Sequence, residues 1–147
     1  MKIYTSYFSQ MKALNNAGIV PINIALWPPK FFRGISIMYL APKRYMLSGK
    51  LTREQYIESY RRDVLGRLNP VAVVREIERL SGGKDAALLC YEKPGEFCHR
   101  RLFAQWMLEE TGLDIPEWGQ EKREEQSILR RAKKEVVEEP SLFELQD

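Results

Sequence analysis

Cysteine and histidine are scarce in this chain, which has two cysteines and one histidine among 147 residues. Two cysteines provide no disulfide framework, so we expect a protein of the reducing cytoplasm. Long apolar runs are lacking too, because Pro21 and Asn23 interrupt the segment 18–27 and no stretch approaches the roughly 20 residues that a membrane span needs. The amino terminus has no signal-peptide pattern, and the chain has no internal repeats or low-complexity segments. We therefore expect no contact with membranes.

The residues that are present are typical of a globular domain, with 44% hydrophobic and 29% charged side chains. The net charge of +3 is distributed unevenly, since residues 117–147 carry nine acidic and six basic side chains and the first 116 residues therefore hold +6. Segment 30–67, with nine basic and three acidic groups, accounts for that excess. Such a segment favours a polyanion-binding surface, although solvated helix faces produce the same excess.

Short apolar segments alternate with amphipathic ones along the chain. We expect strands at 3–8, 20–26 and 86–90, and helices at 10–16, 52–68, 70–80 and from the end of segment 90–101 to residue 110. Thr52 with Gln55 forms a capping box, and Asn69–Pro70 opens the next helix. This alternation predicts a three-layer α/β sandwich with a mainly parallel, Rossmann-like sheet.

We expect residues 1–119 to form a single α/β domain, followed by a charged helix and tail over 120–147. Segment 28–51 is long for a featureless loop, so we expect it to be ordered and functional. Tyr7, at the end of the first expected strand, could stack on a base or pack in the core. Lys30 and Arg33 are candidate phosphate contacts in the basic segment.

The most informative segment is Cys90–Arg101, whose sequence is CYEKPGEFCHRR. It joins the carboxyl end of a buried strand to the amino end of a helix, which is where ligands bind in open α/β sheets. Free backbone N–H groups and the dipole at a helix start favour an anion, and Arg100 and Arg101 supply cationic contacts beside Cys90. In a competing interpretation these arginines pair with Glu92 or Glu96.

Glu92, Cys98 and His99 are the candidate catalytic groups. Glu92 could act as a general acid or base, or could anchor His99. Cys98, near a helix start and beside the histidine, should have a lowered pKa that suits a nucleophile; alternatively it is a small buried thiol behind the loop. The segment contains neither a C-x-x-C redox pair nor a C-x5-R phosphatase loop.

Zinc is an alternative use of the same residues, because Cys90, Cys98, His99 and Glu92 are suitable ligand types. However, Cys98 and His99 are neighbours in the sequence, and adjacent helical side chains diverge by about 100°. The spacing also matches no standard zinc motif. We therefore expect no metal and no cofactor.

The pattern C-x-E-x5-C-H-R, formed by Cys90, Glu92, Cys98, His99 and Arg100, resembles the bacterial and phage domain-of-unknown-function family 488. Further similarities are the segments 4–8, 40–42 and 117–118, so the resemblance spans residues 1 to about 119. It implies an α/β fold with the motif residues at one pocket, and a nucleotide or nucleic acid as ligand. Trp27-Pro28-Pro29 stands where an Asp-Val-Arg-like segment is expected, which indicates a divergent subgroup.

The end of the chain offers a possible protein partner. Ser141-Leu142-Phe143 is similar to the peptide that binds the bacterial sliding clamp, although the tail could equally dock on its own core. Two functional hypotheses follow. The first is a protein that binds, and possibly transforms, a phosphate-bearing ligand at the motif. The second is a non-catalytic module that binds nucleic acid or a protein through segment 30–67 and the tail.

Overall fold

The computed structural model describes residues 1–91, 98–120 and 128–133. The chain divides into two units, Met1–Glu117 and Trp118–Asp147. In the second unit, residues 128–133 are helical. Within the described residues, no helix is long and apolar enough to cross a membrane.

Four parallel strands form one sheet in the order β1-β4-β2-β3. The strands are β1 (Ile3–Tyr7), β2 (Val20–Asn23), β3 (Ile35–Ser36) and β4 (Ala86–Cys90). Every residue of β4 is buried, as expected for a parallel strand with neighbours on both sides and covered faces. Because the strands are parallel, the carboxyl ends of β1, β4 and β2 lie at the same edge of the sheet.

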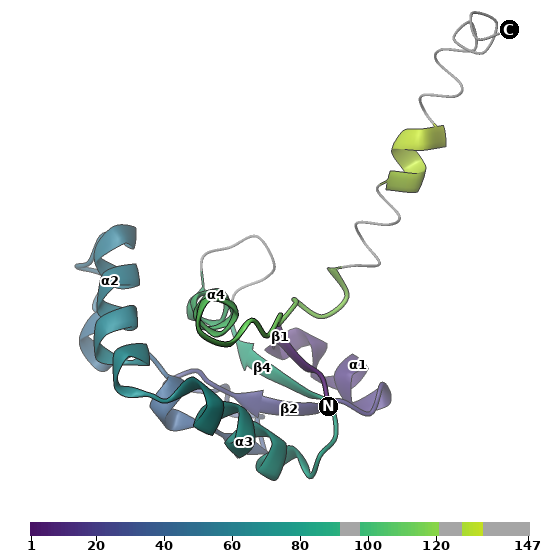
Figure 1. Cartoon of the computed structure of the whole chain (residues 1–147), viewed down its shortest axis with the longest axis horizontal. Helices are drawn as coiled ribbons and strands as arrows, with labels where there is room; N and C mark the ends of the chain where they lie inside the picture. The colour runs from purple at the N-terminus through teal and green to yellow at the C-terminus, as the bar shows by residue number, and fades with distance from the viewer. Residues whose placement is uncertain (92–97, 121–127, 134–147) are drawn as a thin grey trace, which may run out of the picture. The chain divides into compact units, whose positions relative to one another are not determined.

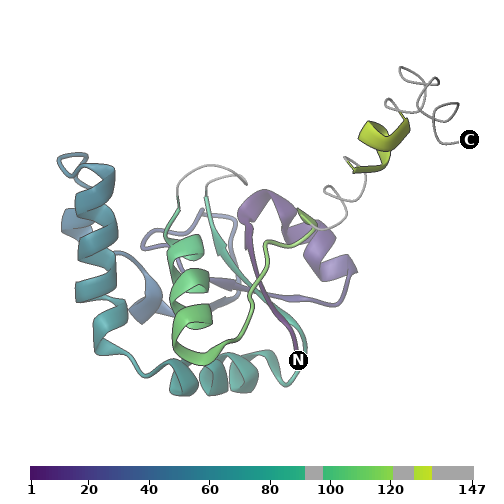
Figure 2. The same cartoon turned by 45° about the horizontal axis from the view of Figure 1, so that its top comes forward.

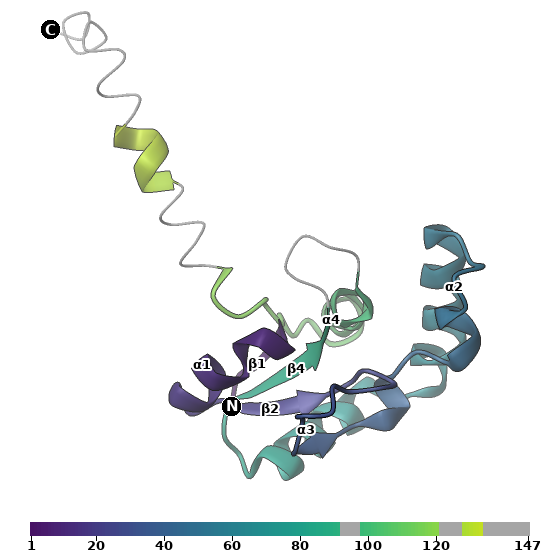
Figure 3. The ribbon, with the colours of Figure 1, turned by 180° about the vertical axis from the view of Figure 1, so that it is seen from behind.

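The helices are α1 (Met11–Asn16), α2 (Arg53–Asp63), α3 (Pro70–Ser81) and α4 (His99–Thr111). Short 3-10 helices are η1 (Phe8–Gln10), η2 (Met38–Leu40), η3 (Arg44–Leu47) and η4 (Leu65–Arg67). Helices α3 and α4 lie on one face of the sheet and α1 lies on the other (Figures 1 and 2). The view from behind places α1 in front of the strands (Figure 3). The predicted α/β sandwich with a parallel sheet is confirmed.

Local sequence signals explain where several elements begin and end. Thr52 and Gln55 form the predicted capping box, with the Gln55 amide donating to Thr52 Oγ1 and the Thr52 amide donating to Gln55 Oε1. Strand β2 ends earlier than predicted, at Asn23, because the Asn23 side chain accepts from the Ala25 amide and donates to the Ala25 carbonyl. That local turn replaces the ladder pairing of a strand.

Buried tyrosine fixes α2 against the rest of the first unit. Tyr60 is fully buried, and its hydroxyl donates to the Leu40 carbonyl oxygen at 2.7 Å. Its ring also packs edge-on against His99, with ring centroids 5.5 Å apart. The contact holds α2 beside the start of α4.

Candidate functional site

The predicted motif lies at the carboxyl edge of the sheet, as its position in the sequence indicated. Cys90 is the last residue of β4, Cys98 is the N-cap of α4 and His99 is the first residue of that helix. Glu92, the predicted proton-transfer group, lies outside the described residues.

Cys90 and Cys98 are joined by a disulfide, and both are buried. The two cysteines, eight residues apart, were expected to give no disulfide framework, yet they form this single bond because the end of β4 lies beside the start of α4. The count of cysteines therefore does not support a reducing compartment, and the cytoplasmic location stays a prediction. The nucleophilic role of Cys98 likewise stays a prediction, and it concerns the reduced protein alone.

Reducing this disulfide should destabilise the metal-free protein. Opening a loop of this length is expected to lower the free energy of unfolding by about 2–3 kcal/mol, because the unfolded chain regains conformational entropy. Denaturant unfolding with a chelator, in the presence and absence of dithiothreitol, measures the change. The double variant Cys90→Ala/Cys98→Ala serves as control and should not respond to dithiothreitol. Equal stability of the oxidised and reduced wild-type protein would contradict the expectation.

His99 is buried and has a defined tautomer. Its Nε2 lies 2.8 Å from the carbonyl oxygen of Ile24, and since that oxygen can only accept, Nε2 carries the proton. The other nitrogen, Nδ1, is 3.9 Å from Cys98 Sγ. Burial lowers the pKa of His99 to about 4, and the neighbouring Arg100 charge acts in the same direction against the opposing hydrogen bond to Ile24. The imidazole is therefore neutral at pH 7, with an available lone pair beside the sulfurs.

The premise that Cys98 and His99 must diverge is wrong. Cys98 has an extended backbone, with φ of −154° and ψ of 144°, because it is the N-cap and not a helical residue. Cys90 Sγ, Cys98 Sγ and a His99 ring nitrogen consequently lie within 4.8 Å of one another. The structure gathers the thiols and the imidazole at one point.

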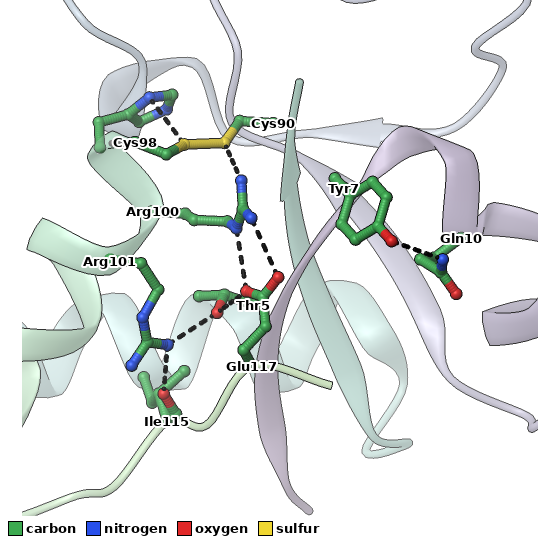
Figure 4. A network of polar contacts seen from close by, with 10 residues as sticks. Thr5, Tyr7, Gln10, Cys90, Cys98, Arg100, Arg101, Ile115 and Glu117 are labelled. Atoms are coloured by element: carbon green, nitrogen blue, oxygen red, sulfur yellow. Dashed lines mark hydrogen bonds and ion pairs between the residues drawn. A yellow bond between two sulfur atoms is a disulfide. The ribbon is translucent and has the colours of Figure 1, made fainter. Parts of the chain in front are cut away.

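Arg100 is held in a buried ion pair. Only 1% of its side chain is exposed, and its Nε and Nη2 donate to the two carboxylate oxygens of Glu117, each at 3.0 Å. Nη1 donates to Cys90 Sγ at 2.8 Å (Figure 4). The competing interpretation, in which this arginine pairs with a carboxylate, describes the structure, and among the described residues the partner is Glu117; Glu92 and Glu96 lie outside them. Arg100 is thus a buried cation directed at a sulfur.

Glu117 reaches this position through a contact at the edge of the sheet. It forms an isolated parallel bridge with Thr5 of β1, whose backbone amide donates to the Pro116 carbonyl oxygen at 3.0 Å. Thr5 Oγ1 also donates to Glu117 Oε1 at 2.7 Å. Sequence reasoning gave Glu117 no role, since the residue entered only as part of the similarity at 117–118.

Two adjoining cavities border the motif. The first, the α2 cavity, measures about 220 Å³ and is lined by Leu47, Leu51, Thr52, Arg53, Tyr56, Cys98 and His99. The second, the Trp27 cavity, measures about 160 Å³ and is lined by Ala25, Leu26, Trp27, Pro42, Leu47, Tyr56, Cys90, Tyr91 and His99. They share three lining residues, of which His99 is one. The amino ends of α2 and α4 therefore meet at the α2 cavity.

Residues 34–111 match the family model DUF488-N3a, which is described as the active DUF488-N3 subclade. The chain belongs to the DUF488 family. Neither the curated proteins nor the solved structures gave a match. The matched span of this DUF488 protein contains the motif from Cys90 to Arg100 but ends before Glu117.

Other residues predicted for the ligand site of this DUF488 protein lie elsewhere. Arg101 Nη1 donates to Thr5 Oγ1 and to the Ile115 carbonyl oxygen, so it connects β1 to the segment that follows α4. The Tyr7 ring lies beside the Arg100 guanidinium, 5.9 Å away, and its hydroxyl accepts from Gln10 (Figure 4). None of these side chains lines the α2 or the Trp27 cavity.

In the basic segment of the DUF488 protein, the residues that line the two cavities are not those predicted as phosphate contacts. Lys30 and Arg33 are exposed, and Arg33 Nη1 donates to the Lys30 carbonyl oxygen at 2.6 Å. Neither lines the α2 cavity or the Trp27 cavity, whereas Pro42, Leu47 and Arg53 do. The tail residues Ser141, Leu142 and Phe143 lie outside the described residues, so their binding to a sliding clamp stays a prediction.

Proposed function

We propose that this DUF488 protein binds a phosphate-bearing ligand, a nucleotide or a nucleotide unit of a nucleic acid, in the α2 and Trp27 cavities. The observation that carries the proposal is the meeting of two helix amino ends at one cavity beside the motif. Thr52 and Arg53 begin α2 there, and Cys98 and His99 begin α4. Both helix dipoles present their positive ends to this space, which favours an anion.

The α4 end is the better candidate for the phosphate contact. The Thr52 side chain caps α2, whereas no side chain caps α4 at Cys98. The first backbone N–H groups of an α-helix have no partner within the helix, so those of α4 are suitable donors to a phosphate. Arg53 adds a positive charge to the wall of the cavity. We assign the cationic contact with the phosphate to Arg53 in place of Arg100, whose donors are bound to Glu117 and Cys90.

The Trp27 cavity suits the base of the same ligand. Trp27 and Tyr91 line it, and the Tyr91 hydroxyl donates to the Trp27 carbonyl oxygen at 2.5 Å. More than half of the Trp27 side chain is exposed, and the Arg44 guanidinium lies 5.9 Å from its ring centroid. Base stacking on an aromatic ring contributes about 1–3 kcal/mol per base. We therefore assign the phosphate to the start of α4 and the base to Trp27, in two cavities that share three lining residues.

A catalytic form of this proposal uses the motif residues. In the metal-free protein it assigns proton transfer to Glu92 or His99, and a nucleophilic thiolate to Cys98 after reduction. The description of the matched subclade as active supports a reaction and not binding alone. Loss of turnover in Glu92→Ala and His99→Ala, with ligand binding retained, would assign these residues to the chemical step.

Binding to the variant Arg53→Gln tests the site. Its affinity for ADP is expected to fall by about tenfold or more, because a hydrogen bond to a charged group contributes about 1.5–3 kcal/mol. Calorimetry with ADP, inorganic phosphate and a short single-stranded oligonucleotide measures it. Arg75→Gln, an exposed arginine of α3, is the matched control and should leave the affinity unchanged.

The variant Trp27→Ala separates the two halves of the proposed ligand. It should weaken the binding of ADP but not of inorganic phosphate, since only ADP has a base to stack. The proposal fails if wild-type protein binds none of the three probes, or if Arg53→Gln and Arg75→Gln bind them equally.

The second candidate function, a non-catalytic binding module, has its own support. Lys30, Arg33, Lys43 and Arg44 are exposed, and Phe31 nearby is 65% exposed. Basic and aromatic side chains together are typical of surfaces that bind single-stranded nucleic acid. Oligonucleotide binding that falls steeply with salt, and that persists in Glu92→Ala and His99→Ala, would favour the module.

A further inference from the structure

We propose that the reduced protein binds one Zn²⁺ ion through Cys90 Sγ, Cys98 Sγ and His99 Nδ1, with the fourth coordination position open to the α2 cavity. The two sulfurs and a ring nitrogen of His99 lie within 4.8 Å of one another, and all three residues are buried. Ligand atoms around tetrahedral zinc are roughly 3.3–3.8 Å apart, given bonds of about 2.3 Å to sulfur and 2.0–2.1 Å to nitrogen. The distance of 3.9 Å from His99 Nδ1 to Cys98 Sγ is already close to that value.

His99 is oriented as a metal ligand. Histidines that bind metals generally donate their other ring N–H to a carboxylate, a backbone carbonyl or a water, which fixes the tautomer and the plane of the ring. His99 does so through Nε2 and the Ile24 carbonyl oxygen at 2.8 Å. This hydrogen bond leaves the lone pair of Nδ1 on the side of the sulfurs.

The contacts and spacing of Cys90 suit a sulfur ligand. Arg100 Nη1 donates to Cys90 Sγ at 2.8 Å, and hydrogen bonds of this kind orient metal ligands. The Cα atoms of Cys90 and Cys98 are 7.5 Å apart. That is wider than the roughly 4.4–6.8 Å usual for disulfides, and it accommodates two separate sulfur ligands.

The charges of the occupied site balance. Two neutral thiols and two thiolates bound to one Zn²⁺ carry the same net charge, so metal binding adds no charge beside the buried Arg100–Glu117 pair. The occupied cluster is therefore neutral, as is the ion pair behind it.

The fourth position determines what the metal could do. Cys98 and His99 form part of the wall of the α2 cavity. Three protein ligands and one open position are typical of catalytic zinc sites, which bind a water or a substrate oxygen there. A phosphate oxygen of the ligand proposed above would be suitable. This last step rests on the proposed function, whereas the metal site itself does not. With zinc on Nδ1, His99 would not transfer protons.

The site would be redox-gated, because the disulfide and the metal use the same sulfurs. A dithiol reductant gives two electrons and two protons to the disulfide, which becomes two thiols, and the reductant becomes a cyclic disulfide. Zinc binding then displaces two protons from the two thiols. The oxidised protein has no thiolate to offer.

Metal titration of the full chain tests the proposal. The protein is reduced with dithiothreitol, freed of it by anaerobic gel filtration, and titrated with Zn²⁺ against a chromophoric chelator and with Co²⁺ alone. We expect one equivalent to bind to reduced protein with a sulfur-to-cobalt charge-transfer band, and none to oxidised protein. Cys98→Ser and His99→Gln should each bind more than about 100-fold less tightly, because even loss of an outer-shell partner reduces metal affinity by about 10–100-fold.

Glu109→Gln, an exposed carboxylate on α4, is the control for adventitious binding and should behave as wild type. Circular dichroism of each metal-free variant establishes that the fold is retained. As a second readout, Cys90→Ala should still show a sulfur-to-cobalt charge-transfer band, and adding His99→Gln to this variant should abolish the band. Equal binding by reduced and oxidised wild type, or by wild type and His99→Gln, would overturn the site. Because these titrations contain no nucleotide, their failure leaves the ADP measurements on oxidised protein unaffected.

Discussion

Replacing Glu117 by leucine is expected to lower the free energy of unfolding by about 3–5 kcal/mol, because it leaves a buried arginine without its counter-ion. Only 2% of the Glu117 side chain and 1% of the Arg100 side chain are exposed. The carboxylate receives both arginine donors at 3.0 Å. Urea unfolding of Glu117→Leu at pH 7 and constant ionic strength measures the effect.

A double-mutant cycle separates the lost charge from lost packing. Arg100→Met/Glu117→Leu should recover much of the stability, since apolar replacement of a whole buried pair is often neutral or stabilising. Arg62, which pairs with Asp63 on the exposed surface, is the comparison, and Arg62→Met should change stability little. A Glu117→Leu variant as stable as Arg62→Met would show that the buried pair is dispensable.

Acidification should destabilise the oxidised, metal-free protein through its one histidine. The folded protein holds the pKa of His99 at about 4, below its ordinary value of 6.5, chiefly because the ring is buried. Between these two values the unfolded chain binds a proton that the folded chain does not, so stability falls as pH falls from 6.5 to 4. Over the whole window the loss approaches about 3 kcal/mol, at about 1.4 kcal/mol per pKa unit. Above pH 6.5 this group causes no further change.

The variant His99→Gln isolates that contribution. Because the chain has a single histidine, wild type minus variant reports on His99 alone, while carboxylates that titrate near pH 4 affect both proteins. Guanidinium unfolding at pH 7.5, 6.0, 5.0 and 4.5 with a chelator gives the two curves. Parallel curves across this range would mean that the ring is protonated in the folded state.

Much of the fold was predictable because its signals are local. The apolar run of β4, the capping box at Thr52 and the Asn69–Pro70 helix start each depend on residues within a few positions of one another. Their alternation then restricts the sheet to a parallel arrangement covered by helices. The end of β2 was predicted less well, since the Asn23 turn competes with apolar residues that continue to Leu26.

The site was predictable in location but not in its contacts. The sequence places Cys90, Cys98 and His99 on one loop, yet it does not reveal that Cys98 is extended and bonded to Cys90. The partner of Arg100 lies 17 residues away and depends on a bridge to β1, which no spacing rule indicates. The contribution of α2 to the wall of the α2 cavity likewise depends on tertiary packing, which the sequence does not reveal.

The bridge between Thr5 and Glu117 has a consequence for where the working unit of this protein ends. The family match stops at Thr111, and a fragment cut there would retain every residue of the C-x-E-x5-C-H-R motif. It would nevertheless lack the carboxylate that neutralises Arg100 and the strand-like contact that positions it. The smallest piece that preserves the electrostatics of the motif therefore extends through Glu117, six residues past the end of the family-model match.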